Sequence, residues 1–112
     1  MFARITVIRI YQDRIDEGIK LYRKGFIPDA KKQKGYCGDI LLVDRKTGRG
    51  NSITFWKSEK DAISNEENLF YQEQLVKFIT FFSAPPIREG YEVVLNTWGT
   101  SAKKKSPKKA KS

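Results

Sequence analysis

The stretch YCGDILLVDRKTGRGNSITFWKS, residues 36–58, decides the fold that the rest of the chain has to complete. Two apolar runs, residues 36–44 and 52–57, have the length and composition of β-strands. Between them, RKTGRGN at residues 45–51 supplies the glycines and the asparagine that a tight chain reversal requires. The stretch therefore predicts two antiparallel strands that lie side by side.

A helical region follows this hairpin. Ser58 with Asp61 has the spacing of a capping box at a helix start, and Ser64 with Glu67 repeats the spacing. We therefore expect a short helix and then a longer one that ends before Pro85 and Pro86. The last turns, residues 75–82, are apolar over a wide arc, which predicts contact with two different surfaces.

A strand and a helix are expected before the hairpin. Residues 2–11 are rich in β-branched side chains of both parities, which predicts a strand with two apolar faces. Asp13 is then the predicted N-cap of a helix whose apolar face carries Ile15, Ile19, Tyr22 and Phe26. Pro28 is expected to end or kink this helix near Phe26, and the helix can restart beyond the proline.

A final strand, predicted at Tyr91–Asn96, completes the order β-α-β-β-α-β. This order indicates an α+β fold of the ferredoxin-like type, an antiparallel sheet with two helices on one face. Apolar residues of both parities occur in the predicted strands, as in Ile40–Val43, although the helices can cover only one face. A homodimer that covers the other face is therefore predicted.

The charge of the chain is concentrated near its C-terminus. The net charge is +9, but residues 101–112 hold six lysines and no acid, which leaves 16 basic and 13 acidic residues elsewhere. The composition predicts a folded domain over residues 1–98 and a disordered lysine-rich tail over residues 99–112. The domain itself is nearly balanced in charge, so its surface does not require a polyanionic partner.

Several kinds of site are excluded or made improbable by composition. The chain has no histidine and only Cys37, so we expect no metal site and no internal disulfide. Gly48-Arg49-Gly50 is too short for a phosphate-binding loop, so no nucleotide cofactor is expected, and none of another kind is indicated. The single cysteine predicts a reducing, cytoplasmic compartment, and the N-terminal stretch carries arginines where a signal peptide would be uniformly apolar.

Two motifs carry a family resemblance over roughly residues 2–95. They are PDAKKQKGYCGDILLVD at 28–44, with a proline before Gly-Tyr-x-Gly and an apolar strand, and ITFWKSEKDA at 53–62, with a tryptophan before a capped acidic helix start. With the final Tyr91-Glu92-Val93 strand, this order resembles the antibiotic biosynthesis monooxygenase (ABM)-like domains of the dimeric α/β-barrel superfamily.

The resemblance implies a pocket between each sheet and its own helices. Some members of the family oxidise aromatic quinols without metal or flavin, others degrade haem, and many have no assigned reaction. The haem-degrading branch uses an asparagine on the first strand, a tryptophan, and a histidine near the start of the second long helix. Trp56 matches the tryptophan, but the other two residues are missing here, which argues against haem degradation.

The candidate ligand-binding residues are aromatic side chains that could surround a flat molecule and arginines that could hold an oxyanion or carboxylate: Trp56, Tyr36, Tyr71, Phe70, Arg9 and Arg88. Each of them is individually common as a core aromatic or a solvated arginine. Taken with the family resemblance, which implies the activity, they favour a cofactor-independent monooxygenase-like enzyme, or a binder, of a small hydrophobic molecule. No catalytic residue is identified, and a ligand of useful size needs a pocket of at least about 300 Å³.

An alternative function rests on the tail. Ser106-Pro107-Lys108-Lys109 resembles a minor-groove-binding SPKK unit, and the tail lysines could contact phosphates: Lys103, Lys104, Lys105, Lys108, Lys109 and Lys111. The domain would then be a non-catalytic dimeric adaptor attached to nucleic acid. A single copy of the motif is equally compatible with a solubilising appendage.

Overall fold

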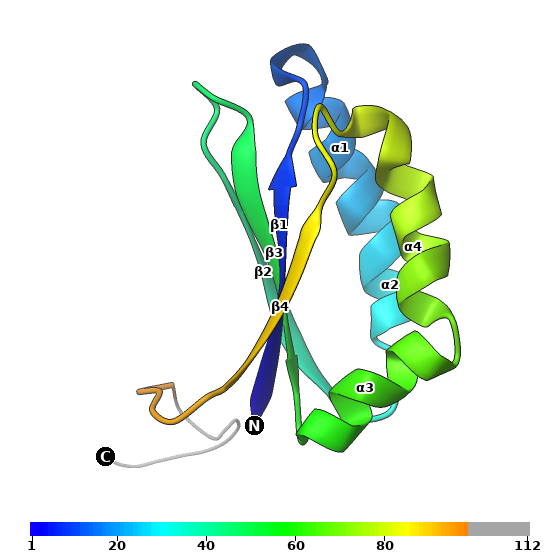
Figure 1. The fold of residues 1–112 in the computed structure, drawn as a ribbon, viewed down its shortest axis with the longest axis vertical. Coiled ribbons are helices and arrows are strands. Elements are labelled where there is room, and N and C mark those ends of the chain that lie inside the picture. Colours follow the sequence, from blue (N-terminus) through cyan, green and yellow to red (C-terminus); the bar gives the residue numbers. More distant parts are fainter. Residues whose placement is uncertain (99–112) are drawn as a thin grey trace.

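The computed structural model of the protein describes residues 1–98, which form a four-stranded antiparallel sheet with all helices on one face (Figure 1). The strands are β1 (Phe2–Arg9), β2 (Tyr36–Val43), β3 (Arg49–Trp56) and β4 (Ile87–Glu92), in the spatial order β2-β3-β1-β4. The helices are α1 (Ile15–Leu21), α2 (Ile27–Ala30), α3 (Glu59–Glu67) and α4 (Phe70–Phe78). The predicted ferredoxin-like fold is therefore confirmed. The predicted tail lies outside the described residues.

The register of the central strands determines on which of the two faces of the sheet each side chain lies. β1 and β3 pair from Phe2 opposite Trp56 to Arg9 opposite Arg49, with β4 beside β1 and β2 beside β3. Because side chains alternate along a strand, Thr6 faces the helices while Ile5 faces away. The predicted hairpin is confirmed, although β3 begins at Arg49 rather than Ser52, since Asp44 N–H already bonds Arg49 O at 2.7 Å.

The first helical region differs from the prediction in its start and in its course past Pro28. Asp13 does not cap it: the residue before α1 is Arg14, whose side chain makes no capping hydrogen bond. Helical backbone continues through Pro28 because a π-helical turn, Tyr22–Phe26 (η2), precedes it, with Ile27 N–H bonded to Tyr22 O. The wider turn and the place of Pro28 at the start of α2 accommodate the missing N–H.

The second helical region begins as predicted, because Ser58 Oγ accepts a hydrogen bond from Asp61 N–H at 3.1 Å. The break between its two helices lies later than Ser64, where it was predicted. Leu69 has a left-handed conformation, with φ 69°, and Asn68 Oδ1 accepts from Phe70 N–H at 3.0 Å. The capping residue of the break is therefore Asn68, while the Ser64 hydroxyl donates to Asp61 O inside α3.

The last strand was predicted too late in the sequence. β4 spans Ile87–Glu92 instead of Tyr91–Asn96, because its pairing with β1 runs from Ile87 opposite Val7 to Glu92 opposite Phe2. One more backbone bond, from Val93 N–H to Met1 O, ends the ladder where β1 itself begins. The apolar residues beyond that point, Val94 and Leu95, are over 80% exposed.

The core lies between the sheet and the helices and has two parts. One cluster contains Ile8, Ile10, Ile15 and Phe81, and the other contains Tyr22, Phe26, Ala30 and Phe70. Residues of both clusters also line the candidate site described below, among them Ile8 and Phe26.

The opposite face of the sheet has no helix over it. Apolar side chains on its strands are 38–59% exposed: Ile40, Leu42, Ile87 and Tyr91. Only part of this face is covered within the described chain, where Trp98 packs edge-on against Phe55 with 5.1 Å between the ring centroids. The sheet is thus apolar on both faces and covered by helices on one.

Candidate functional site

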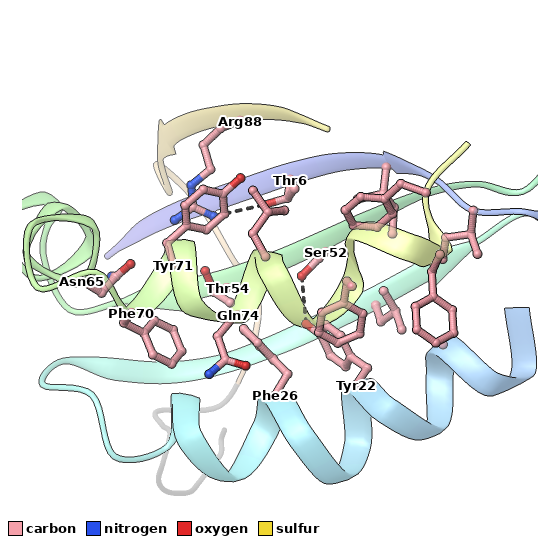
Figure 2. Close-up of a pocket in the computed structure, with 18 of the residues that line it drawn as sticks. Thr6, Tyr22, Phe26, Ser52, Thr54, Asn65, Phe70, Tyr71, Gln74 and Arg88 are labelled. Atoms are coloured by element: carbon pink, nitrogen blue, oxygen red, sulfur yellow. Dashed lines mark hydrogen bonds between the residues drawn. The ribbon is translucent and has the colours of Figure 1, made fainter. Parts of the chain in front are cut away.

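A cavity of about 70 Å³ lies between the helix-facing side of the sheet and the helices (Figure 2). Its walls are mainly aliphatic and aromatic, and Phe26, Phe70 and Phe78 come from three different turns of the helical layer. Polar side chains reach it from strands and helices: Thr6, Tyr22, Ser52, Thr54, Asn65, Gln74 and Arg88. An apolar cavity with a few convergent polar groups is the usual form of a small-molecule site.

Trp56 is at the base of the site and is only 1% exposed. Its indole N–H donates to Thr54 Oγ1 at 2.9 Å, so that donor is already used inside the protein. Tyr36 packs edge-on behind it, with 6.0 Å between the ring centroids, and does not line the cavity. Trp56 therefore offers a ligand its ring surface rather than its polar group.

Arg88 is the charged residue of the cavity. Its guanidinium lies over the Tyr71 ring, 3.8 Å from the centroid, and donates to Thr6 Oγ1 at 3.0 Å. Glu66 Oε2 lies 3.5 Å from Arg88 Nη2 and 2.5 Å from Arg4 Nη2, so one carboxylate is shared by two arginines. The pKa of Arg88 is lowered, first because it is buried and then because Arg4 is close.

This cluster has more positive than negative charge. Arg4 and Arg88 have side chains that are 16% and 18% exposed, and the Nε–H of each is buried without a hydrogen-bond partner. Two arginines and one carboxylate leave a net charge of about +1 beside an apolar space. A ligand that carries or develops negative charge would be stabilised there.

A second polar group lies where the π-helical turn meets β3. The Tyr22 and Ser52 hydroxyls are hydrogen-bonded to each other at 2.9 Å. Burial raises the pKa of Tyr22, so its hydroxyl stays protonated at neutral pH and acts as a donor or acceptor but not as a base. Tyr22 and Leu41 also line a separate, more open groove of about 370 Å³ that contains Asp39.

The structure places only some of the candidate ligand-binding residues at the cavity. Trp56, Phe70, Tyr71 and Arg88 line the cavity. Tyr36 supports Trp56 from outside, and Arg9 is exposed at the end of β1 and does not line it. Arg9 points away because its odd position in β1 puts it on the face opposite to Thr6.

Most polar cavity residues were not among the candidates from sequence, and two of these, Asn65 and Gln74, are buried amides. They are 2% and 6% exposed, and a polar amide at such positions is unusual. Gln74 stands four residues from both Phe70 and Phe78, so it interrupts an apolar stripe at helical spacing. That interruption was the available signal for Gln74, and the three-residue spacing of Asn65 from buried Ala62 was the signal for Asn65.

Two kinds of feature are absent from residues 1–98. No three His, Cys, Asp or Glu side chains in this range are placed to hold a metal ion. No helix in it is long and apolar enough to cross a membrane.

Comparison with known sequences gives few relatives. No known family profile matches the chain. A 54-residue segment, 47% of the chain, is 38% identical to the Mycobacterium tuberculosis protein Rv2557, which is described as uncharacterized. That segment spans 24% of the relative, so the chain corresponds to about a quarter of its length.

Comparison with solved structures is more informative about the fold. An antibiotic biosynthesis monooxygenase superposes with a TM-score of 0.66 at 17% identity, over 85% of this chain and 100% of its own. The Streptomyces coelicolor monooxygenase ActVA-Orf6, in complex with Nanaomycin D, gives 0.66 at 12%, over 86% and 92% of the chains. The Mycobacterium tuberculosis heme-degrader MhuD, with two hemes bound, gives 0.61 at 16%, over 88% and 100%. The chain therefore has an ABM-like domain fold.

Proposed function

We propose that the domain binds a small, mainly apolar aromatic molecule in the cavity and oxidises it with O₂, as a monooxygenase that needs no metal or flavin. The observation that supports this most directly is the position of Arg88, a buried cation at one side of a space walled by aromatic rings. Monooxygenases among the structures of the same fold add to the support.

The reaction that suits such a site is oxidation of a phenol at a ring carbon that carries hydrogen. Phenol and O₂ give a quinone and water: one oxygen atom becomes the new carbonyl, and the other leaves as water. The substrate supplies all the electrons, so no other reductant is consumed. The phenol must first lose its proton, because the electron-rich phenolate is the form that donates electrons to O₂.

Arg88 would promote that proton loss through charge. A free phenol has a pKa near 10, and a guanidinium within a few ångströms favours its anion. Glu66 is engaged by Arg4 and Arg88 and is poorly placed to act as base. We therefore infer that the proton passes to water, while Arg88 stabilises the charge left on the ring oxygen.

The described cavity must enlarge to take a two-ring ligand. Its volume of about 70 Å³ is below the roughly 300 Å³ of pockets for drug-sized ligands. Tyr22 and Leu41 line both the cavity and the open groove of about 370 Å³. Movement of these two side chains would join the two spaces, which makes the groove the proposed access route.

We also propose that the domain forms a homodimer through the uncovered face of its sheet. Isolated apolar side chains on a surface need no explanation, but four exposed on a single sheet face form a surface suited to a self-complementary partner. Pairing of two copies there would leave the helix-facing cavity of each unaltered.

The test uses 1,5-dihydroxynaphthalene, whose oxidation by one O₂ gives 5-hydroxy-1,4-naphthoquinone and one water. We expect protein-dependent O₂ uptake with equal quinone formation, and one ¹⁸O atom in the product when ¹⁸O₂ is supplied. Arg88→Gln should lower the rate about 100-fold, as loss of one charge-stabilising donor typically does. Arg9→Gln is the matched control, because Arg9 is exposed and outside the cavity. Calorimetry that detects no binding of the diol, together with no O₂ uptake, would refute the proposal.

A further inference from the structure

Two amide oxygens in the cavity have no hydrogen-bond donor. Asn65 Oδ1 and Gln74 Oε1 are both buried and unpartnered, and both residues line the cavity (Figure 2). Buried polar atoms are almost always hydrogen-bonded in folded proteins, and an exception needs a reason. Two exceptions of the same chemical kind in one cavity point to a common cause.

The orientation of Asn65 is fixed by its surroundings. Its Nδ2 donates to Ala62 O at 2.6 Å and to Asp61 O at 3.3 Å. Both partners are carbonyl oxygens, which only accept, so exchanging the nitrogen and oxygen of the amide would set oxygen against oxygen. Asn65 Oδ1 therefore has to point away from α3.

Gln74 is fixed in the same way by a different partner. Its Nε2 donates to Asp29 Oδ2 at 3.0 Å, and the same carboxylate oxygen is ion-paired with Lys77 at 3.0 Å. The pKa of Asp29 is lowered by its hydrogen bond to Lys77, so this carboxyl is ionised and can only accept. The NH₂ group of Gln74 must face Asp29, which leaves Oε1 without a protein donor.

Both positions would be filled more simply by apolar side chains. Gln74 lies between Phe70 and Phe78 on the buried face of α4, and Asn65 follows Ala62 on the buried face of α3. An apolar residue of similar shape would leave no unsatisfied atom, and a buried polar group without a partner is destabilising. The amides are thus unfavourable for the empty domain.

We propose that Asn65 and Gln74 are specificity-determining residues that accept hydrogen bonds from hydroxyl groups of the ligand. This inference rests on the proposed function, since it concerns the same cavity. Two fixed acceptors select a molecule with hydroxyl donors and reject one whose oxygens only accept, such as a methyl ether. Arg88, at one side of the cavity, and the two acceptors would then contact different parts of one hydroxylated ring system.

Calorimetric titration with 1,5-dihydroxynaphthalene and with 1,5-dimethoxynaphthalene tests the selection. The two probes share the ring system, and only the first has donors. We expect the diol to bind at least about tenfold more tightly, the worth of one good hydrogen bond. Asn65→Leu and Gln74→Met in combination should weaken the diol about tenfold, because one of its two hydroxyls lies at Arg88 and the other donates to the amides, and should leave the affinity for the dimethoxy compound unchanged. Gln72→Met is the matched control, because Gln72 is exposed on the same helix.

A thermal melt of each variant without ligand separates this role from a structural one. We expect Asn65→Leu and Gln74→Met to melt at or above the temperature of the unaltered protein, because each removes an unsatisfied buried acceptor. If the two amides instead serve stability through ordered water, both variants will melt lower and their preference for the diol will be intact, which would overturn the inference. Equal binding of both probes would also overturn it while leaving the proposed function standing; binding of neither probe, together with no O₂ uptake, refutes both.

Discussion

Substitution of Glu66 by glutamine tests the charge balance of the site most directly. Glu66 Oε2 accepts from Arg4 at 2.5 Å and from Arg88 at 3.5 Å, and no other carboxylate is ion-paired with either arginine in the described part of the chain. The Glu66→Gln variant keeps the shape of the side chain and leaves two guanidinium groups facing each other. The expected result is a loss of folding stability and a site that attracts anions more strongly.

The size of the loss follows from how buried the three side chains are. Removing one partner of a fully buried ion pair costs about 3–5 kcal/mol. Here the side chains of Glu66, Arg4 and Arg88 are 30%, 16% and 18% exposed, so solvent screens part of the interaction. We expect about 2 kcal/mol, which for a domain of this size lowers Tm by about 8–16 °C.

Urea unfolding followed by circular dichroism measures this loss. Glu67→Gln is the control, because Glu67 is the next residue of α3 and is exposed. High salt should reduce the difference between Glu66→Gln and the unaltered protein, since it screens the repulsion between Arg4 and Arg88. Adding Arg4→Met to Glu66→Gln should recover part of the loss, since one of the two uncompensated charges is then gone. Equal stability of the Glu66→Gln and Glu67→Gln variants would refute the reasoning.

Two further predictions concern the open groove and the uncovered sheet face. Burial raises the pKa of Asp39 above its unfolded value, so its ionised form opposes folding. Asp39→Asn should therefore be more stable than the unaltered protein at pH 7, and urea midpoints should converge as the pH falls below about 4; equal midpoints at pH 7 would contradict this. Ile53→Glu, on the uncovered face of β3, should convert the proposed dimer to a monomer in sedimentation equilibrium, whereas Ile63→Glu, exposed on α3, should not. A monomeric unaltered protein would exclude the dimer.

Sequence reasoning succeeded where local signals determine structure. The apolar, β-branched runs of the strands, the glycines of the hairpin and the Ser58 cap each depend on neighbouring residues, and together they specified the ferredoxin-like order. It failed where contacts between residues distant in sequence determine the structure. The ends of β4, for example, are set by pairing with β1. The helical path through Pro28 is a local case, because it depends on the π-helical turn before it, which has no distinct sequence pattern.

The candidate site was only partly predictable for the same reason. Trp56, Phe70, Tyr71 and Arg88 were found by residue type, but the partner that makes Arg88 distinctive, the Arg4–Glu66 pair, joins residues 62 positions apart. Arg9 was also chosen by residue type, and it lies on the opposite face of the sheet; residue type does not reveal the face of a strand unless the register is known. Tyr36 was included as an aromatic that could surround a flat molecule, and it contacts Trp56 from outside the cavity.

Several side-chain arrangements that destabilise the folded domain lie at or beside the cavity. Arg4 and Arg88 share one carboxylate, and Asn65 and Gln74 each hold a buried oxygen without a donor. A sequence selected for stability alone would fill such positions with apolar residues, as it does in the neighbouring clusters around Ile15 and Phe26. An aromatic ligand with an acidic hydroxyl group would provide an anion for the two arginines. Its hydroxyl donors would bond the two amide oxygens, so one ligand would satisfy both sets of groups. Stability without ligand and affinity for such a ligand should therefore change in opposite directions when either amide is replaced by an apolar residue.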